Sequence, residues 1–447
     1  MKIPEKRALI ALIVLCFFLK LAIAHPSFSD ENVYFLMGKR ISEGQMPYKG
    51  FNFVHPPFQI YLLAFLFKLF GVSILVGKLL PLIASSLSVY LIYLIGTELY
   101  KEKVGIFSAI IFLLTPIFIA FSDQGYGMWE SLLFLLISTF FILKNKIKLS
   151  ALMFTISIFF RYIAIFYFPF LLIFIYLKKR NVKQFLLIFL VSASLVFSTL
   201  YLVFGYNFID DTVLYQVYAR LYSVQLPKMY SQYLDYGFFT LFLCLVSTYV
   251  AYIKKDNLLL LLSVYPIVID LLVLATFKTV IYHYFLLSLP FIMIATTRAF
   301  SISKDMVIRL FLITVLFLSF ISNFRTIDYY LNPKNSENIQ QIKQYIQNNT
   351  SKNDNIFGES SITDYISFTT DTPITSNYLD SFLSYMSYIS EQKVIGNLEN
   401  QKPKFIIDME NYYMSNPNFR AYIESKYELR ETFSGIPSYF IYERKVS

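Results

Sequence analysis

Long apolar runs separated by short polar stretches occupy most of the first 322 residues. A helix that spans a membrane needs about 20 mostly apolar residues, and the runs predict about eleven spans. Two of the runs, 131–143 and 149–160, are short by this measure. The runs cover residues 8–24, 73–99, 104–121, 131–143, 149–160, 162–177, 184–205, 237–253, 257–276, 281–297 and 306–322.

Composition supports an integral membrane protein over a soluble one. Of the 447 residues, 56% are hydrophobic and 15% are charged, and the mean hydropathy is +0.55. The net charge of +10 would suit nucleic acid, but the basic residues lie in short segments between apolar runs, which disfavours that partner. These segments contain Lys2, Lys6 and Arg7; Lys101 and Lys103; Lys144, Lys146 and Lys148; Lys178, Lys179 and Arg180; Lys254 and Lys255; and Arg298, Lys304 and Arg309.

The basic segments fall in every second connection, and the positive-inside rule therefore predicts that all of them are cytoplasmic. We expect a multi-pass protein of the cell membrane with a cytoplasmic N-terminus and a C-terminal region outside. The first run also resembles a signal peptide, with small residues at Ala22 and Ala24, although Lys20 interrupts it. With or without cleavage, residue 30 lies on the external side.

The first external segment, residues 25–72, is too long for a passive connection and contains two helical patterns. One runs from Asp30 to about Ser42. The other, from Pro57 to Phe70, is apolar but too short to span, begins at a proline and stops before a glycine. We expect the second helix to lie along the outer membrane surface.

After residue 322 the chain becomes polar, which predicts two domains: a transmembrane domain, 1–322, and a soluble extracytoplasmic domain, 323–447. In the second, the segments SENIQQIKQYIQNN and FRAYIESKY are helical, while NIFGES, KFIIDM and SYFIYER indicate strands. This alternation predicts a small α/β domain. Overlapping N-glycosylation sequons begin at Asn348 and Asn349.

The first external loop, SDENVYFLMGKRISEGQMPYKGFNFVHPPFQIYLLAFLFKLFG, resembles that of GT-C superfamily glycosyltransferases, especially protein mannosyltransferase and aminoarabinose transferase relatives. The shared features are an acidic pair that opens a helix, a Gly-x-x-Pro-Tyr turn from Gly44 to Tyr48, and His-Pro-Pro before a second helix. TPIFIAFSDQGYGMWESLLFLL and later segments continue the likeness more weakly. The WWDYG-type signature is absent, which disfavours transfer of a whole oligosaccharide.

The resemblance implies that a single sugar is transferred from a dolichyl- or undecaprenyl-type phosphate carrier to a protein, lipid or glycan acceptor on the external face. Asp30 matches the position of the catalytic base, which would take the acceptor proton while the anomeric centre inverts. The plainer interpretation is that Asp30 and Glu31 only favour the start of a helix. Glu31 could instead hold Asp30, touch the acceptor or bind a divalent ion.

Further candidates lie in the other external connections. Glu130 stands where related enzymes often have an acidic residue, and is our third catalytic candidate; Asp123 shares its loop, and either could be only a solvated loop charge. Arg161 lies alone between two apolar runs, where a charge is functional by default, and could bind the lipid phosphate or reach lipid headgroups.

Three weaker candidates for substrate binding complete the set. Lys278 and His283 lie a little over one helical turn apart, where they could meet the phosphate or anchor headgroups. His55 precedes two prolines at the expected membrane surface, and it could simply cap the loop.

Cofactors and rival functions are less constrained. No cysteine framework or familiar metal spacing occurs, and the acidic residues could at most hold a loosely bound Mg²⁺ or Mn²⁺. A transporter or flippase for lipid-linked sugars would need polar residues near mid-membrane and often an inverted repeat, neither of which is evident. A noncatalytic subunit of a glycan-assembly complex predicts that the Asp30 side chain is dispensable.

Overall fold

A computed structural model describes residues 5–24, 29–222, 226–276, 282–331, 336–375, 390–435 and 437–445. Helices follow all eleven apolar runs, because uninterrupted apolar residues satisfy their backbone groups within a helix. The helices are α1 (Glu5–Ala22), α4 (Ile74–Leu99), α5 (Glu102–Leu113), α6 (Pro116–Phe121), α7 (Met128–Leu143), α8 (Ile147–Phe160), η1 (Tyr162–Tyr167), α9 (Phe168–Leu177), α10 (Val182–Phe204), α13 (Leu226–Lys254), α14 (Asn257–Thr276), η3 (Tyr282–Leu287), α15 (Leu289–Ile302) and α16 (Met306–Leu331).

Three of these helices are both long and apolar enough to cross a membrane, among the residues that the structure describes: Ile74–Leu99, Val182–Phe204 and Asn257–Ala275. Several apolar helices are shorter, including α7, α8 and α15. The helical state of the predicted runs is confirmed, whereas the number of crossings and their orientation stay predictions.

Two short breaks separate successive helices of unit 1. The run 104–121 breaks before Pro116, and the Thr115 hydroxyl caps the new helix by accepting a hydrogen bond from the Phe118 amide at 3.3 Å. Arg161 is extended (φ −149°, ψ 120°) between α8 and η1. A charged residue at such a break can carry its side chain away from both helix axes.

By its internal contacts the chain forms two compact units. Unit 1 contains Met1–Ala24, Lys78–Val203 and Arg220–Leu331, and unit 2 contains His25–Gly77, Phe204–Ala219 and Asn332–Ser447. The first loop and the C-terminal region therefore share one unit, a grouping that differs from the predicted limits 1–322 and 323–447. Those limits stay a prediction about separate domains.

In unit 2 the two predicted loop helices are confirmed as α2 (Glu31–Ser42) and α3 (Phe58–Phe70), which pack against each other. Gly38 allows the close approach, because a Cβ at this position would lie 2.7 Å from that of Leu63. Gly71, with a φ of +84°, ends α3 as expected. Between the two helices, Tyr48 has a φ of +62°, which a non-glycine residue seldom adopts.

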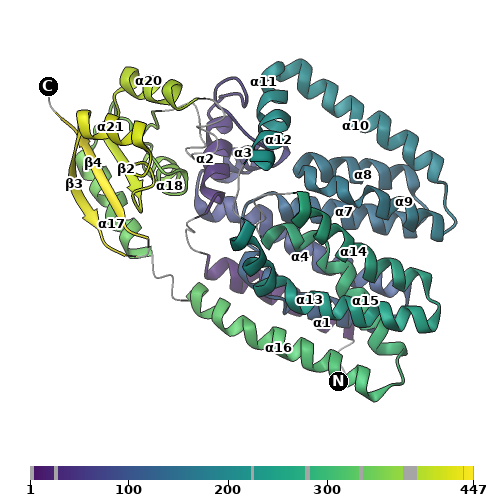
Figure 1. Cartoon of the computed structure of the whole chain (residues 1–447). Helices are drawn as coiled ribbons and strands as arrows, with labels where there is room; N and C mark the ends of the chain where they lie inside the picture. Colours follow the sequence, from purple (N-terminus) through teal and green to yellow (C-terminus); the bar gives the residue numbers. More distant parts are fainter. Residues whose placement is uncertain are drawn as a thin grey trace. The chain divides into compact units, whose positions relative to one another are not determined.

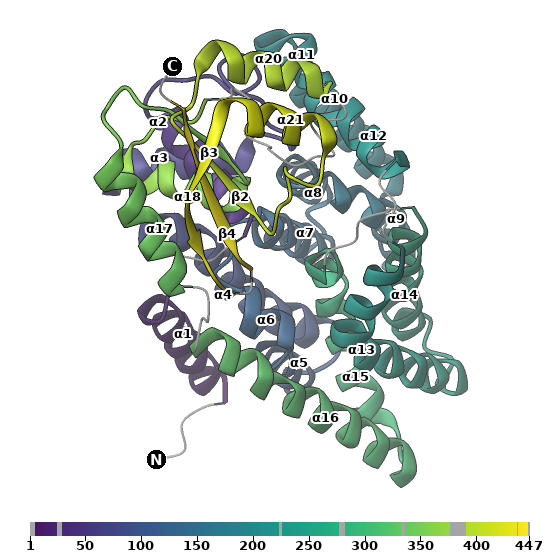
Figure 2. The ribbon, with the colours of Figure 1, turned by 60° about the vertical axis from the view of Figure 1, so that its left-hand side comes forward.

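The C-terminal part of unit 2 contains both helices and strands, as Figures 1 and 2 show. The strands form one sheet in the order β1-β2-β4-β3, in which β1 and β2 are parallel and the other pairs are antiparallel. The elements are α17 (Ser336–Asn349), β1 (Ile356–Gly358), α18 (Ser360–Thr370), α20 (Glu391–Gln401), β2 (Phe405–Met409), α21 (Pro417–Lys426), β3 (Tyr427–Phe433) and β4 (Tyr439–Arg444).

Each face of this sheet has its own apolar core. In β2, Phe405 and Ile407 enter one core while Ile406 enters the other, as the period of two in a strand requires. Residues of α17 and α18 complete the first core, and residues of α20 and α21 complete the second. The predicted strands and helices of this part are confirmed, and three elements are added: α18, α20 and β3.

Candidate functional site

The predicted catalytic pair lies at the start of α2 in unit 2. Asp30 is the N-cap residue and makes no side-chain capping hydrogen bond. The Asp30 side chain is half-buried, whereas Glu31 is fully buried. Of the two, Asp30 is therefore the carboxylate that solvent or a ligand can reach.

His55 belongs to an aromatic cluster beside α2. Its ring stacks on Tyr34 with a centroid distance of 5.9 Å and meets the edge of Phe53 at 5.9 Å. The His55 carbonyl accepts a hydrogen bond of 2.6 Å from the Tyr48 hydroxyl. These contacts give His55 a packing role, and its role in binding stays a prediction.

The segment 204–219 holds this loop in place from the other side. The buried Asp211 carboxylate accepts hydrogen bonds from the Asn52 side chain at 2.9 Å and from the Phe53 amide at 3.2 Å. Asn207 donates to the Tyr48 carbonyl at 2.8 Å. No spacing rule in the sequence connects residue 211 to residue 52.

In unit 1, the buried Asp123 has two cationic partners. Its carboxylate lies 3.2 Å from the Lys78 ammonium of α4 and 3.5 Å from the Lys20 ammonium of α1. The side chains of Lys78 and Asp123 are each 1% exposed. This ion triad joins the loop after α6 to two helices, which gives Asp123 a structural role in addition to the predicted one in substrate binding.

Arg161 and His283 meet at Tyr126 in the same loop. The Arg161 Nε donates to the Tyr126 carbonyl, and the His283 ring stacks on the Tyr126 ring with a centroid distance of 4.9 Å. Both side chains are buried. Two candidates that are separate in the sequence thus converge on a tyrosine that the sequence analysis did not single out.

Glu130 lies in the first turn of α7, after Gly127, whose φ is +76°. Its side chain is 2% exposed, and neither carboxylate oxygen has a hydrogen-bond partner among the described residues. The positive charge of Arg161 lies close enough to attract the Glu130 carboxylate. A buried carboxyl in this situation suits a ligand that donates hydrogen bonds, such as a sugar hydroxyl.

One candidate residue and the possible metal site remain to be described. Lys278 lies outside the described residues. Within the described ranges, no group of three or more His, Cys, Asp or Glu side chains could hold a metal ion.

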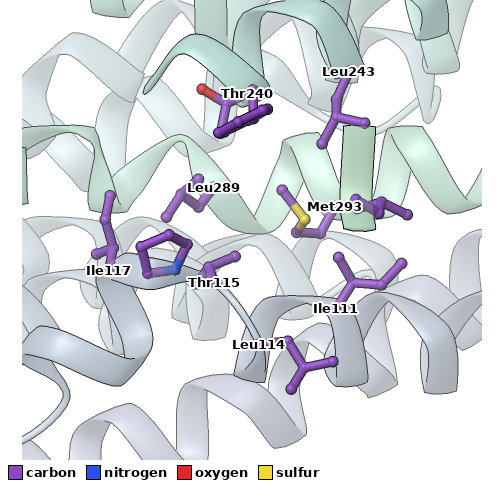
Figure 3. Close-up of a pocket in the computed structure, with 11 residues that line it drawn as sticks. Ile111, Leu114, Thr115, Ile117, Thr240, Leu243, Leu289 and Met293 are labelled. Atoms are coloured by element: carbon purple, nitrogen blue, oxygen red, sulfur yellow. The ribbon is translucent and has the colours of Figure 1, made fainter. Parts of the chain in front are cut away.

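Unit 1 also contains an apolar cavity of about 70 Å³. Figure 3 shows Leu289 and Met293 of α15 facing Thr115 and Ile111, with Leu243 of α13 above them. Its lining offers one hydroxyl from Thr115 and one from Thr240 among mostly aliphatic side chains. The cavity suits an apolar group and has no catalytic side chain in its lining.

The comparisons with known proteins agree with this architecture. The family model described as dolichyl-phosphate-mannose-protein mannosyltransferase matches residues 54–222. The search of curated protein sequences found no match.

Among solved structures, ArnT from Cupriavidus metallidurans bound to undecaprenyl phosphate has a TM-score of 0.68 and 10% identity, with 97% of each chain covered. Its apo form has a TM-score of 0.66, 11% identity and the same coverage. The archaeal oligosaccharyltransferase AglB from Archaeoglobus fulgidus, with an inhibitory peptide and a dolichol-phosphate, has a TM-score of 0.55 and 11% identity. That comparison covers 99% of this chain and 74% of AglB.

At these identities the structural likeness shows the shared fold, and the family match concerns residues 54–222. The resemblance read from the first external loop is thereby confirmed. The chain therefore has the fold of these solved glycosyltransferases, and its residues 54–222 match the mannosyltransferase family.

Proposed function

We propose that this enzyme transfers one sugar, with inversion, from a polyprenyl-phosphate carrier to an acceptor on the extracytoplasmic face, with Asp30 as the general base. The observation that carries the proposal is the family match over residues 54–222, because the description of that family names a polyprenyl-phosphate sugar as donor. The ArnT and AglB structures, which hold undecaprenyl phosphate and dolichol-phosphate, support a lipid-phosphate donor.

The reaction is a single displacement at the anomeric carbon. The acceptor hydroxyl gives its proton to the Asp30 carboxylate, and its oxygen forms a bond to the anomeric carbon. The bond from this carbon to the phosphate oxygen breaks, and the polyprenyl phosphate leaves with the electron pair. Because attack comes from the face opposite the phosphate, the configuration inverts.

Residues of unit 1 have distinct roles in the proposal. Arg161 binds the phosphate, since a guanidinium is always charged and can donate several hydrogen bonds to phosphate oxygens. His283, stacked on the same tyrosine, assists it. Glu130 accepts hydrogen bonds from sugar hydroxyls. Asp123 keeps the loop that carries Tyr126 in place.

The test is sugar transfer in liposomes from a panel of radiolabelled polyprenyl-phosphate sugars, with the native chain and Asp30→Asn. The control is Asp305→Asn, because Asp305 also precedes a helix but does cap it, accepting from the Val307 amide at 2.8 Å. We expect Asp30→Asn to lose activity by at least about 100-fold, and Asp305→Asn to keep it.

Two results would contradict the proposal. Normal transfer by a folded Asp30→Asn chain would reduce Asp30 to a helix-start residue and move the search for the base to Glu130. The absence of transfer by the native chain from every donor would favour a transporter or a noncatalytic subunit.

A further inference from the structure

Helix α18 of the C-terminal region lies against α2, the helix that Asp30 opens, within unit 2. Near their first residues, the Asn32 side chain donates to the Ser361 carbonyl at 2.9 Å. Near their last residues, Lys39 donates to the Phe368 carbonyl at 3.1 Å. Because start meets start and end meets end, the two helices run parallel and in a fixed register.

Apolar contacts hold this register along the helices. The ring of Phe368 lies 6.0 Å from that of Phe35 on α2 and 5.7 Å from that of Phe67 on α3. Lys39 also forms an ion pair with Asp371, directly after α18. Sliding one helix along the other by a turn would break all of these contacts together.

The register brings the two N-cap residues together. Both contacts between the helices join residues 329 positions apart, and the same separation joins Asp30 to Glu359, the N-cap residue of α18. Asp30 lies close enough to Glu359 for the two carboxylates to repel each other. Two carboxyl groups therefore lie at neighbouring helix starts, one from the first loop and one from the C-terminal region.

Glu359 is held more firmly than a surface acid. Its side chain is 5% exposed and accepts a hydrogen bond from the Ser361 hydroxyl. Its amide donates to the Ile407 carbonyl of β2 at 3.2 Å. The carboxylate of Glu359 also lies close enough to Tyr439 of β4 to interact with it electrostatically.

We propose that Glu359 is a positioning residue for the transfer reaction, carried by the C-terminal region to the side of the base Asp30. The inference rests on the proposed function and extends it. When Glu359 is ionised, its negative charge makes removal of the acceptor proton by Asp30 more favourable, because two like charges favour protonation of one of them. When Glu359 is protonated, this assistance is absent.

The expected signature is a change in the pH profile. Glu359→Gln keeps the size of the side chain and an oxygen for Ser361, and it imitates the protonated glutamate. We therefore expect its kcat to equal that of the native enzyme at acidic pH. As the pH rises and native Glu359 ionises, kcat of the variant should fall to about one third to one tenth of the native value.

The experiment measures kcat and KM between pH 5 and 9 for the native chain, Glu359→Gln, Glu359→Asp and the control Glu399→Gln, which changes an exposed glutamate of α20. Glu359→Asp keeps the charge, so it should recover part of the rise of kcat with pH. If Glu359→Gln does not fold, Ser361→Ala, which removes the hydroxyl that holds the carboxyl, should shift the profile in the same pH range.

Three results separate this inference from the proposed function. If Glu359→Gln has the same dependence of kcat on pH as the native chain while Asp30→Asn is inactive, the positioning role of Glu359 is overturned and the role of Asp30 is kept. A loss that is equal at every pH shows a merely structural role and also overturns it. Activity in Asp30→Asn overturns the base and the positioning role together, because Glu359 acts through Asp30.

Discussion

Lys78 and Asp123 form a buried ion pair, with 3.2 Å between the ammonium nitrogen and a carboxylate oxygen. Removing Lys78 takes away the nearer cation and leaves the buried carboxylate with Lys20 alone at 3.5 Å, and weakening a buried ion pair in this way costs about 3 kcal/mol. We expect Lys78→Met to lower the free energy of unfolding by about this amount, measured in detergent. The control is Lys144→Met, because the Lys144–Glu98 pair is exposed and contributes less than about 1 kcal/mol.

The same pair allows a second comparison. Lys78→Met combined with Asp123→Asn should be less stable than Lys78→Met alone, since the Lys20 ammonium then loses its carboxylate partner. If the double variant is as stable as the single one, the ion triad does not account for the loss.

Arg161 should be irreplaceable by lysine. An ammonium lacks the planar fork of N–H donors that a guanidinium has, one of which Arg161 uses on the Tyr126 carbonyl. We expect Arg161→Lys to raise KM for the polyprenyl-phosphate donor by about tenfold, with a smaller change in kcat. Arg309→Lys, in the basic segment of α16, is the matched control. An unchanged KM would assign Arg161 to packing only.

Glu359 makes stability depend on pH. Burial raises the pKa of its carboxyl above the ordinary value of 4.5, and the nearby charge of Asp30 raises it further, while the hydrogen bond from Ser361 opposes the change. The folded state therefore favours the protonated form. The stabilisation that the protonated Glu359 gives to the folded state is fully present below about pH 4.5. It is lost as the pH rises through the folded-state pKa of this carboxyl.

We therefore expect Glu359→Gln, which cannot ionise, to gain in melting temperature relative to the native chain as the pH rises from 4.5 to 8. Glu399→Gln should show no such trend. A constant difference between the native chain and Glu359→Gln would contradict the raised pKa.

The contact between α2 and α3 depends on the absence of a side chain at residue 38. Gly38→Ala would place a Cβ 2.7 Å from that of Leu63, and such overpacking costs about 1–3 kcal/mol. Gly396→Ala is the control, because nothing lies within 4 Å of a Cβ there and alanine favours a helix over glycine by about 1 kcal/mol. In thermal unfolding, Gly38→Ala should therefore lower the melting temperature, and Gly396→Ala should raise it.

The helices are the part of this structure that the sequence predicts well. Uniform apolar runs identify α4 and α10, and Pro57 with Gly71 sets the limits of α3. The strand β3 is missed because its sequence, YELRETF, follows a helical pattern directly and is mostly exposed. Helix α18 is missed because SSITDYISFTT is polar and rich in β-branched residues, and its burial comes from the contact with α2.

The site is only partly predictable for a similar reason. A lone charge between apolar runs marks Arg161, and an acidic pair at a helix start marks Asp30. Nothing in the spacing shows that Tyr126 connects Arg161 to His283, or that Lys20 and Lys78 share one carboxylate, because these pairings are long-range. The sequence does not predict that Glu359 lies beside Asp30, since this relation depends on the register of two helices.

The parallel register of α2 and α18 has a consequence for how the chain is made. The contacts between them join residues 329 positions apart, and at 5–20 residues per second a ribosome needs roughly 20–60 s to synthesise that length. During this interval α2 exists without its partner. Cellular quality control therefore encounters an incomplete first loop in every newly made molecule, and mutations on α18 should act first by lowering the amount of protein that survives synthesis.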